Sequence, residues 1–209
     1  MGYKFAEIAF TPRVRAEQER AGSRAAYARR EAGDGNPRDR FGPDEAAFIA
    51  ARDSFYLASV SETGWPYVQH RGGTRGFLRV LDDKTLGFAD YAGNRQYVSL
   101  GNIQGDDRVS LFLMDYANRA RMKIMGRMRV VDIADASAIE RLTTPDATAT
   151  IERGFIISVE AYDWNCSKFI TERYSEDEVR KVVSAMSDRI AELESEVRRL
   201  RGVSEVEVD

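Results

Sequence analysis

The sequence predicts a mainly β protein with peripheral helices, in which short antiparallel strands form a barrel. Strand-like runs rich in β-branched and aromatic residues follow one another closely in the central part of the chain. Turn residues separate these runs, and the helix-like segments gather toward the two ends of the chain. Short strands with few crossover helices between them are typical of an antiparallel barrel rather than of a doubly wound sheet.

The composition predicts three parts along the chain: an N-terminal helical extension with a linker (1–43), the barrel (44–172) and a C-terminal helix (173–209). Residues 12–31 are rich in helix formers, and Pro12 suits a first helical turn. Their apolar stripe is thin, so we expect this segment to lie on the body or on a partner subunit. Gly and Pro punctuate residues 33–43, which we interpret as the linker.

The central part is expected to begin with a short helix from Pro43 to Ala51. We expect turns at 61–64 and 82–84, and a second short helix from Arg95 to Gln104. Seven runs have strand character: 55–60, 66–70, 77–81, 85–89, 109–114, 122–131 and 155–161.

The C-terminal part carries the clearest periodic signal, a heptad seam of about three repeats. Its a positions are Val183, Ile190 and Val197, and its d positions are Val179, Met186, Leu193 and Leu200. Branched residues at a with Leu at d favour a parallel two-stranded coil, and the flanking charges, Arg189 with Glu194 and Glu196 with Arg201, are opposite in sign. The other interpretation is a helix packed on its own barrel.

The charge balance and the apolar pattern exclude several classes of partner. There are 31 basic and 34 acidic residues, a net charge of -3, whereas nonspecific nucleic-acid binding needs a basic face. No apolar run approaches the roughly 20 residues of a membrane span, and no secretory pattern opens the chain. Cys166 is the only cysteine, so no intrachain disulfide can form. We therefore expect a cytoplasmic protein with no nucleic-acid or membrane partner.

The single histidine and single cysteine also limit the chemistry. One chain cannot supply a two-His zinc site or a Cys-rich zinc or iron–sulfur site, and we expect no metal. His70 is the only histidine, so any Ser-His-Asp or Cys-His machinery would have to use it. Cys166 is interpreted as inert packing.

Two neighbouring segments carry the candidate site. In the first, Gln69, His70 and Arg71 supply polar groups for a heterocycle or a phosphate, and Gly72 and Gly73 permit close approach to the backbone. An ordinary strand and turn is the alternative.

The second segment runs from Asp90 to Gln96. Asn94 is a good helix N-cap residue, and the backbone N–H groups of the new helix with the Arg95 guanidinium would form an anion site. Alternatively, Asn94 only caps the helix and Arg95 faces water.

Two further segments carry cations. Arg121 belongs to a basic run at the start of a strand, and Lys168 follows the last strand, in a segment where Trp164 could pack against a ring. Either cation could reach an anion or face solvent.

Taken together, these segments resemble the pyridoxamine 5'-phosphate oxidase-like family of flavin-binding split barrels. The resemblance covers about residues 44–170 and rests on the order of three motifs: P-Y-V-Q-H-R-G-G (66–73), G-N-R-Q (93–96) and N-C-x-K-F-I (165–170). It implies a six-stranded antiparallel split barrel and an obligate homodimer with FMN at the subunit interface. It also implies that the cofactor-binding residues are Gln69, His70, Arg71, Gly72, Gly73, Asp90, Asn94, Arg95, Gln96, Arg121 and Lys168.

The resemblance favours an FMN-dependent oxidoreductase of unknown substrate. In the oxidase a Ser-Arg-Lys triplet holds the phosphate, whereas this chain has Asn94-Arg95-Gln96, and the C-terminal Arg and His pattern that holds pyridoxamine phosphate is not recognisable. A true pyridoxamine-phosphate oxidase is therefore not expected. The alternatives are a non-catalytic flavin store, sensor or electron-transfer protein, a haem protein using His70, and a protein that binds the deazaflavin F420.

Overall fold

The computed structural model describes residues 2–32, 36–145, 149–164 and 167–204. Part of the predicted linker (33–35) and two residues of the third motif, Asn165 and Cys166, lie outside these ranges. The chain divides into two compact units, which are described separately: residues 1–115 with 119–169, and residues 116–118 with 170–209.

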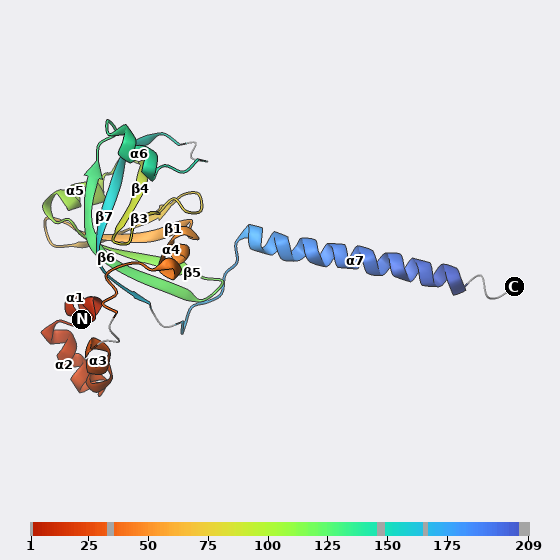
Figure 1. Ribbon diagram of the computed structural model, residues 1–209, viewed down its shortest axis with the longest axis horizontal. Helices are drawn as coiled ribbons and strands as arrows, with labels where there is room; N and C mark the ends of the chain where they lie inside the picture. The colour runs from red at the N-terminus through yellow and green to blue at the C-terminus, as the bar shows by residue number, and fades with distance from the viewer. Residues whose placement is uncertain (1, 33–35, 146–148, 165–166, 205–209) are drawn as a thin grey trace. The chain divides into compact units, whose positions relative to one another are not determined.

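The first unit is built on one antiparallel sheet of seven strands (Figure 1). The strands are β1 (Ser54–Val60), β2 (Pro66–Gly72), β3 (Arg79–Asp82), β4 (Thr85–Tyr91), β5 (Arg108–Asp115), β6 (Ala120–Val131) and β7 (Ile151–Trp164). Their order across the sheet is β2-β1-β5-β6-β7-β4-β3. The seven predicted runs therefore all contain strands, and the count of six is wrong because the short β3 pairs with β4 as a seventh strand.

The sheet is not a closed barrel, because β2 and β3 are its edges and no backbone ladder joins them. Side chains nevertheless connect distant strands across the core. The Phe55 ring on β1 lies 5.5 Å from Phe77 and 5.3 Å from Phe88 on β4, and Phe88 lies 5.3 Å from Phe155 on β7. The sheet thus curves around an aromatic centre although its backbone stays open.

The strands alternate as half-buried strands should. On β1 and β5 the side chains of Leu57, Leu111 and Leu113 are buried, and their neighbours in sequence are more exposed. The edge strand β2 alternates more weakly, with Tyr67, Gln69 and Arg71 half-buried and the residues between them exposed. This period of two decides which β2 side chains face the interior.

The described chain begins with three helices: α1 (Lys4–Ala9), α2 (Pro12–Arg20) and α3 (Arg24–Ala32). The predicted helical stretch 12–31 is therefore two helices, with Gly22 between them in a left-handed conformation (φ 70°). Helix α2 begins at Pro12 as expected, and the Thr11 hydroxyl accepts a hydrogen bond from the Val14 N–H at 3.4 Å. Helix α1 packs Phe5 and Ala6 against Ala161 of β7.

The remaining helices of this unit are α4 (Pro43–Ala50), α5 (Val98–Gly105) and α6 (Ala136–Leu142). The predicted helix from Pro43 is confirmed. Helix α6 covers β4 and β7, where Gly87 and Gly154 leave room for Leu142; a Cβ atom at either glycine would overlap the Leu142 side chain. These glycines serve close packing of the helix on the sheet.

The second unit contains α7 (Glu176–Ser204), a helix of 29 residues. A capping box begins it: the Ser175 hydroxyl accepts from the Glu178 N–H at 3.3 Å, and the Glu178 carboxylate accepts from the Ser175 N–H at 2.7 Å. The predicted C-terminal helix is present. The pairing of α7 with a partner, and the division of the chain at residues 43 and 172, stay predictions.

Within the described ranges, no helix has both the length and the hydropathy needed to cross a membrane.

The aromatic centre should dominate the stability of the first unit. Phe55 is 1% exposed, so Phe55→Ala is expected to lower the free energy of unfolding by about 3–5 kcal/mol through lost burial and a residual cavity. Ile133→Ala is the control, because Ile133 is 50% exposed and its truncation should cost under about 0.5 kcal/mol. Urea unfolding followed by circular dichroism measures both. Equal losses in the two variants would contradict this account of the core.

Candidate functional site

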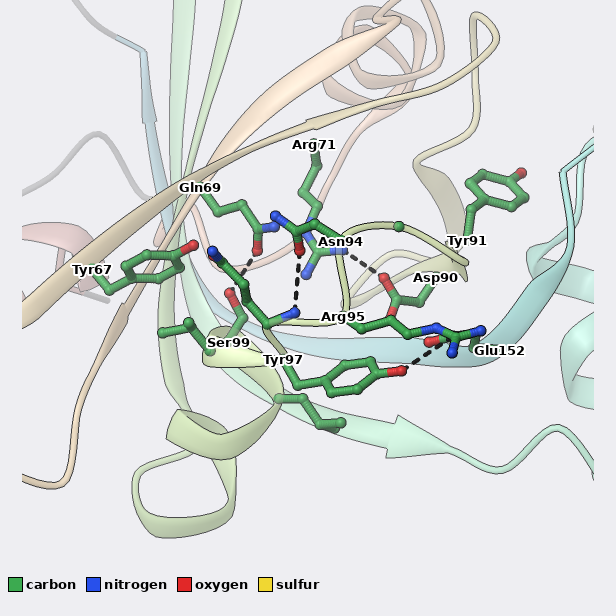
Figure 2. Close-up of a pocket in the computed structure, with 14 residues that line it drawn as sticks. Tyr67, Gln69, Arg71, Asp90, Tyr91, Asn94, Arg95, Tyr97, Ser99 and Glu152 are labelled. Carbon is green, nitrogen blue, oxygen red and sulfur yellow. Dashed lines mark hydrogen bonds and ion pairs between the residues drawn. The ribbon is translucent and has the colours of Figure 1, made fainter.

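A cavity of about 240 Å³ lies where β2, β4 and the start of α5 come together (Figure 2). Glu152, near the start of β7, lines the same space. The remaining lining residues are Tyr67, Gln69, Arg71, Asp90, Tyr91, Gly93, Asn94, Arg95, Gln96, Tyr97, Val98, Ser99 and Leu100. Both predicted segments, 66–73 and 90–96, therefore contribute to one cavity.

The pleat of β2 directs alternate side chains into this cavity. Tyr67, Gln69 and Arg71 line it, as a period of two requires. His70 is exposed on the other face of the strand, where its ring lies 5.7 Å from Tyr56 in an edge-on arrangement. Gln69 and Arg71 therefore share a site, and His70 does not join them there.

An ion network ties the cavity wall together. Asp90 on β4 accepts a hydrogen bond at 2.6 Å from Nη1 of Arg71 on β2, and its other carboxylate oxygen lies 3.7 Å from Nε of Arg153 on β7. Arg153 also donates to Glu152 through Nη2 at 2.6 Å. All four side chains are largely buried, so the pairs are screened far less than surface pairs would be. The network joins the edge strand β2 to β4 and β7.

Two donors in this network have no acceptor. Nε of Arg71 and Nη1 of Arg153 are buried without a hydrogen-bond partner among the described residues. Leaving a buried charged donor unpaired costs about 1–3 kcal/mol or more. Arg71, Arg95 and Arg153 carry three positive charges against two negative charges on Asp90 and Glu152, which leaves one positive charge. The site is therefore suited to an anion with several acceptor oxygens.

The segment between β4 and α5 does not begin the helix where the sequence predicts. Asn94 Oδ1 accepts from the Gln96 N–H at 3.2 Å, which closes a local turn. Arg95 and Tyr97 both adopt left-handed conformations (φ 57° and 52°), so α5 starts only at Val98. The prediction that Asn94 caps this helix is wrong, because its side chain caps the turn instead and Tyr97 occupies the N-cap position.

This segment carries backbone strain. Left-handed conformations are uncommon for residues other than Gly, Asn and Asp, and each costs on the order of 1–2 kcal/mol. Such residues persist where the surroundings hold them, and they gather at ligand-binding segments. Two of them within three positions, beside the cavity, are a second sign of a binding site.

The first turn of α5 faces the cavity with Val98, Ser99 and Leu100. The N-cap residue Tyr97 makes no side-chain capping bond, so N–H groups of this turn remain to be satisfied by another acceptor. The buried Ser99 hydroxyl donates to Gln69 Oε1 at 3.0 Å, which orients the Gln69 amide and leaves its NH₂ group as the remaining donor.

Arg95 lies at the mouth of the cavity and is held loosely. Its side chain is 73% exposed, and its Nε lies 3.9 Å from Glu152 Oε1. The Tyr97 hydroxyl donates to the same carboxylate oxygen at 3.2 Å (Figure 2). The Arg153 guanidinium lies 4.8 Å from the Tyr97 ring centre. Arg95 is thus an exposed cation above a fixed network.

Six predicted site residues line this cavity: Gln69, Arg71, Asp90, Asn94, Arg95 and Gln96. The glycines Gly72 and Gly73 do not line it. A Cβ atom on Gly72 would lie 3.1 Å from the His70 ring, and one on Gly73 would lie 2.7 Å from Phe77, so in this chain both serve packing.

Arg121 and Lys168 also lie away from the cavity. Arg121 is on β6 opposite Met114, beside the inward-facing Met122, and therefore points to the outer face of the sheet. His70 belongs to this outer face too, since it pairs with Tyr56, which pairs with Phe112. Nε of Arg121 is buried without a partner in the part of the chain that the structure describes. Lys168 is exposed after β7.

Sequence reasoning did not select Tyr67, Tyr97, Ser99, Glu152 or Arg153. The period of two along β2 was a usable signal for Tyr67, because it shares a face with Gln69 and Arg71. Glu152, which lines the cavity, and Arg153, which contacts Asp90, had no local signal, since both are placed by the β4–β7 pairing, in which Arg153 is opposite Asp90.

The described residues contain no group of three or more His, Cys, Asp or Glu side chains placed to hold a metal ion.

The central carboxylate should matter for stability. Asp90→Asn keeps the shape but leaves Arg71 and Arg153 without their shared counter-charge, so we expect the free energy of unfolding to fall by about 3 kcal/mol. Phosphate or sulfate should restore part of the loss by neutralising the two cations. Asp83→Asn, which removes an exposed ion pair with Arg40, is the control and should change stability much less. Thermal unfolding with and without phosphate measures this, and an Asp90→Asn protein as stable as the parent would refute it.

Several solved structures resemble this chain at low sequence identity. A protein described as a putative pyridoxamine 5'-phosphate oxidase from Lactobacillus delbrueckii is 18% identical, with 60% of this chain and 94% of that chain covered and a TM-score of 0.46. An FMN-binding protein from Syntrophomonas wolfei is 11% identical, with 72% and 97% covered and a TM-score of 0.44. Similarities of this size carry no argument about function. A comparison with curated proteins gave no match.

The central part of the chain matches the model of a known protein family. The model of the family described as pyridoxamine 5'-phosphate oxidase matches residues 42–153. This match begins just before α4 and ends early in β7, and it covers β1 to β6, the strained segment and α5. It takes in more than half of the chain and all the residues that line the cavity. The chain belongs to the pyridoxamine 5'-phosphate oxidase family.

Proposed function

We propose that the cavity binds the phosphate end of FMN and that the protein is a flavin-dependent oxidoreductase acting on a small molecule. The observation that carries the proposal is Arg71, which lines the cavity with its buried Nε unpartnered among the described residues and belongs to a network with one excess positive charge. A phosphate group supplies several acceptor oxygens and the negative charge that the site lacks. The N–H donors of residues 98–100, in the first turn of α5, and the Arg95 guanidinium would complete its coordination.

The cavity is large enough to enclose only part of FMN. Ligand cavities are usually about 300–1,000 Å³, whereas this one has about 240 Å³. It suits a phosphate and part of a ribityl chain, and the isoalloxazine ring would extend beyond it. Another surface must then cover the ring.

We propose that a second subunit covers the isoalloxazine ring. The outer face of β2 and β1 exposes Val68 and Tyr56, and the same face carries His70. The buried Nε of Arg121, on the outer face of β6, is a further donor in need of an acceptor. A homodimer with FMN at its interface would give His70, Arg121 and Lys168 a role that the cavity of one chain does not offer.

When bound, the flavin ring would supply the electron transfer, and the protein would supply binding, orientation and electrostatics. Arg71 would hold the phosphate, Arg153 would fix Asp90 and Glu152 behind it, and Arg95 would close over it. Ser99 would keep the Gln69 amide oriented toward the cofactor. Oxidation of pyridoxamine phosphate itself is not proposed, since the C-terminal Arg and His pattern for that substrate is not recognisable.

A non-catalytic flavin-binding protein is the second candidate. The described carboxylates and guanidinium groups that line the cavity are already engaged with one another, so none of them is poised as a general acid or base. A flavin store or an electron-transfer protein needs no such group.

Arg95 offers a direct test of the phosphate site. A hydrogen bond to a charged group contributes about 1.5–3 kcal/mol, so Arg95→Ala should weaken FMN binding by about 10- to 150-fold. Fluorescence titration of the purified apoprotein measures this affinity. The exposed Arg79 on β3, outside the cavity, provides the matched control: Arg79→Ala should bind FMN as the parent does. Unchanged affinity in Arg95→Ala would remove Arg95 from the site.

The absorbance spectrum of the purified protein tests the identity of the cofactor. We expect a two-band yellow flavin spectrum after reconstitution with FMN, followed by bleaching with a nicotinamide nucleotide under anaerobic conditions. Tight binding without reduction by either nucleotide would favour the non-catalytic role. A Soret band, or selective binding of F420, would replace FMN in the proposal.

A further inference from the structure

The seam of α7 forms an exposed apolar stripe. Its members in the described chain, Val179, Val183, Met186, Ile190, Leu193, Val197 and Leu200, are each between 44% and 61% exposed. A single helix in water gains nothing from presenting such a stripe, because helix stability in proteins comes mostly from packing of the apolar face. A stripe of spacing 3.5 that runs for about three heptads matches the buried seam of a coiled coil.

We propose that α7 pairs with α7 of a second copy of this chain as a parallel, in-register, two-stranded coiled coil. The core favours two strands, because the a positions hold Val183, Ile190 and Val197 while two of the d positions hold Leu193 and Leu200. This inference is independent of the proposed flavin function, since it uses no residue of the cavity.

The charges beside the seam choose the parallel orientation. In a parallel coil the g position of one helix faces the e position one heptad later on its partner. Arg189 then faces Glu194 and Glu196 faces Arg201, so each interface side carries two attractive pairs. The g position before them, Val182, faces Ser187 and adds no repulsion.

An antiparallel coil with the same overlap is less favourable. Its a and d layers pair Val183 with Leu200, so that e positions face e positions and g positions face g positions. Arg180 would then face Arg201, a repulsive pair, while Arg189 would still face Glu196. The repulsion between Arg180 and Arg201 offsets the attraction between Arg189 and Glu196.

The charged side chains beside the seam can leave their contacts within one helix and pair with the second helix. In the single chain Arg189 pairs with Glu192 at 2.8 Å, and Glu196 lies 3.9 Å from Arg199, both within one helix and well exposed. Exposed pairs of this kind contribute little to stability. Pairing across the seam would therefore replace weak contacts while the apolar stripe becomes buried.

Disulfide trapping of the full chain tests the orientation. Val183→Cys in a Cys166→Ser background should form a covalent dimer on mild oxidation, because facing a positions bring Cα atoms within the roughly 4.4–6.8 Å that a disulfide needs. In the antiparallel coil residue 183 faces residue 200, and since 200 − 183 = 17 residues, the two introduced cysteines would lie about 25 Å apart. Lys181→Cys, on the opposite side of the same turn, is the control and should remain monomeric on the same gel.

Two outcomes would overturn the proposal. One is equal trapping of Val183→Cys and Lys181→Cys, or trapping of neither. The other is a covalent dimer formed when the Val183→Cys chain is mixed with a Leu200→Cys chain, with none from Val183→Cys alone, which would show an antiparallel coil.

A charge reversal provides a measurement that does not depend on an introduced cysteine. Arg189→Glu should weaken the dimer, seen as a several-fold loss of dimer in sedimentation at low concentration, and adding Glu194→Arg should restore it. In an antiparallel coil the second change would not restore the dimer, because the introduced glutamate would still face Glu196. Trapping and sedimentation of α7 variants need no bound flavin, so the absence of a coil would leave the phosphate site that Arg95→Ala tests untouched, and loss of that site would leave the coil untouched.

Discussion

The carboxylate of Asp90 holds together a sheet whose backbone does not close. Its contacts with Arg71 on β2 and Arg153 on β7 join an edge strand to two strands on the far side of the sheet order. The aromatic rings of Phe88 and Phe155 lie beneath, each 5.7 Å from the Arg71 guanidinium. The cavity lies where the edge strand β2 approaches β4, and the Arg71 and Asp90 side chains that link these two strands also line it.

The proposed anion site rests on the same network. Two arginines share one buried carboxylate, and each keeps a buried N–H without an acceptor among the described residues. A buried ion network is often no more stable than an apolar replacement, so stability alone does not account for these charges. The strained conformations of Arg95 and Tyr97 fit this view, because strain persists where the fold enforces a particular geometry. The buried Arg71–Asp90 pair and the exposed Arg95 side chain at the cavity mouth suit a ligand that enters from solvent.

Self-association is proposed to use two separate surfaces of the chain. The outer face of β1 and β2 is proposed to cover the flavin ring, and the seam of α7 is proposed to form a coil. A parallel coil would place the two copies of α7 side by side with the same direction, which is compatible with a two-fold dimer. Each surface can be disrupted without the other, so their contributions to dimer formation and to cofactor binding are separable by experiment.

Local patterning in the sequence determined a large part of this structure. The seven strand-like runs, the helix at Pro43 and the heptad seam follow from periodicity and turn residues, and the family follows from the order of three motifs. Only the tertiary structure decided that Gln69 and Arg71 face the cavity while His70 faces away, that α5 starts at Val98, and that Arg153 pairs with Asp90. These features depend on strand pleat, on a left-handed backbone and on pairing between β4 and β7, which are contacts between distant residues that composition and spacing do not encode.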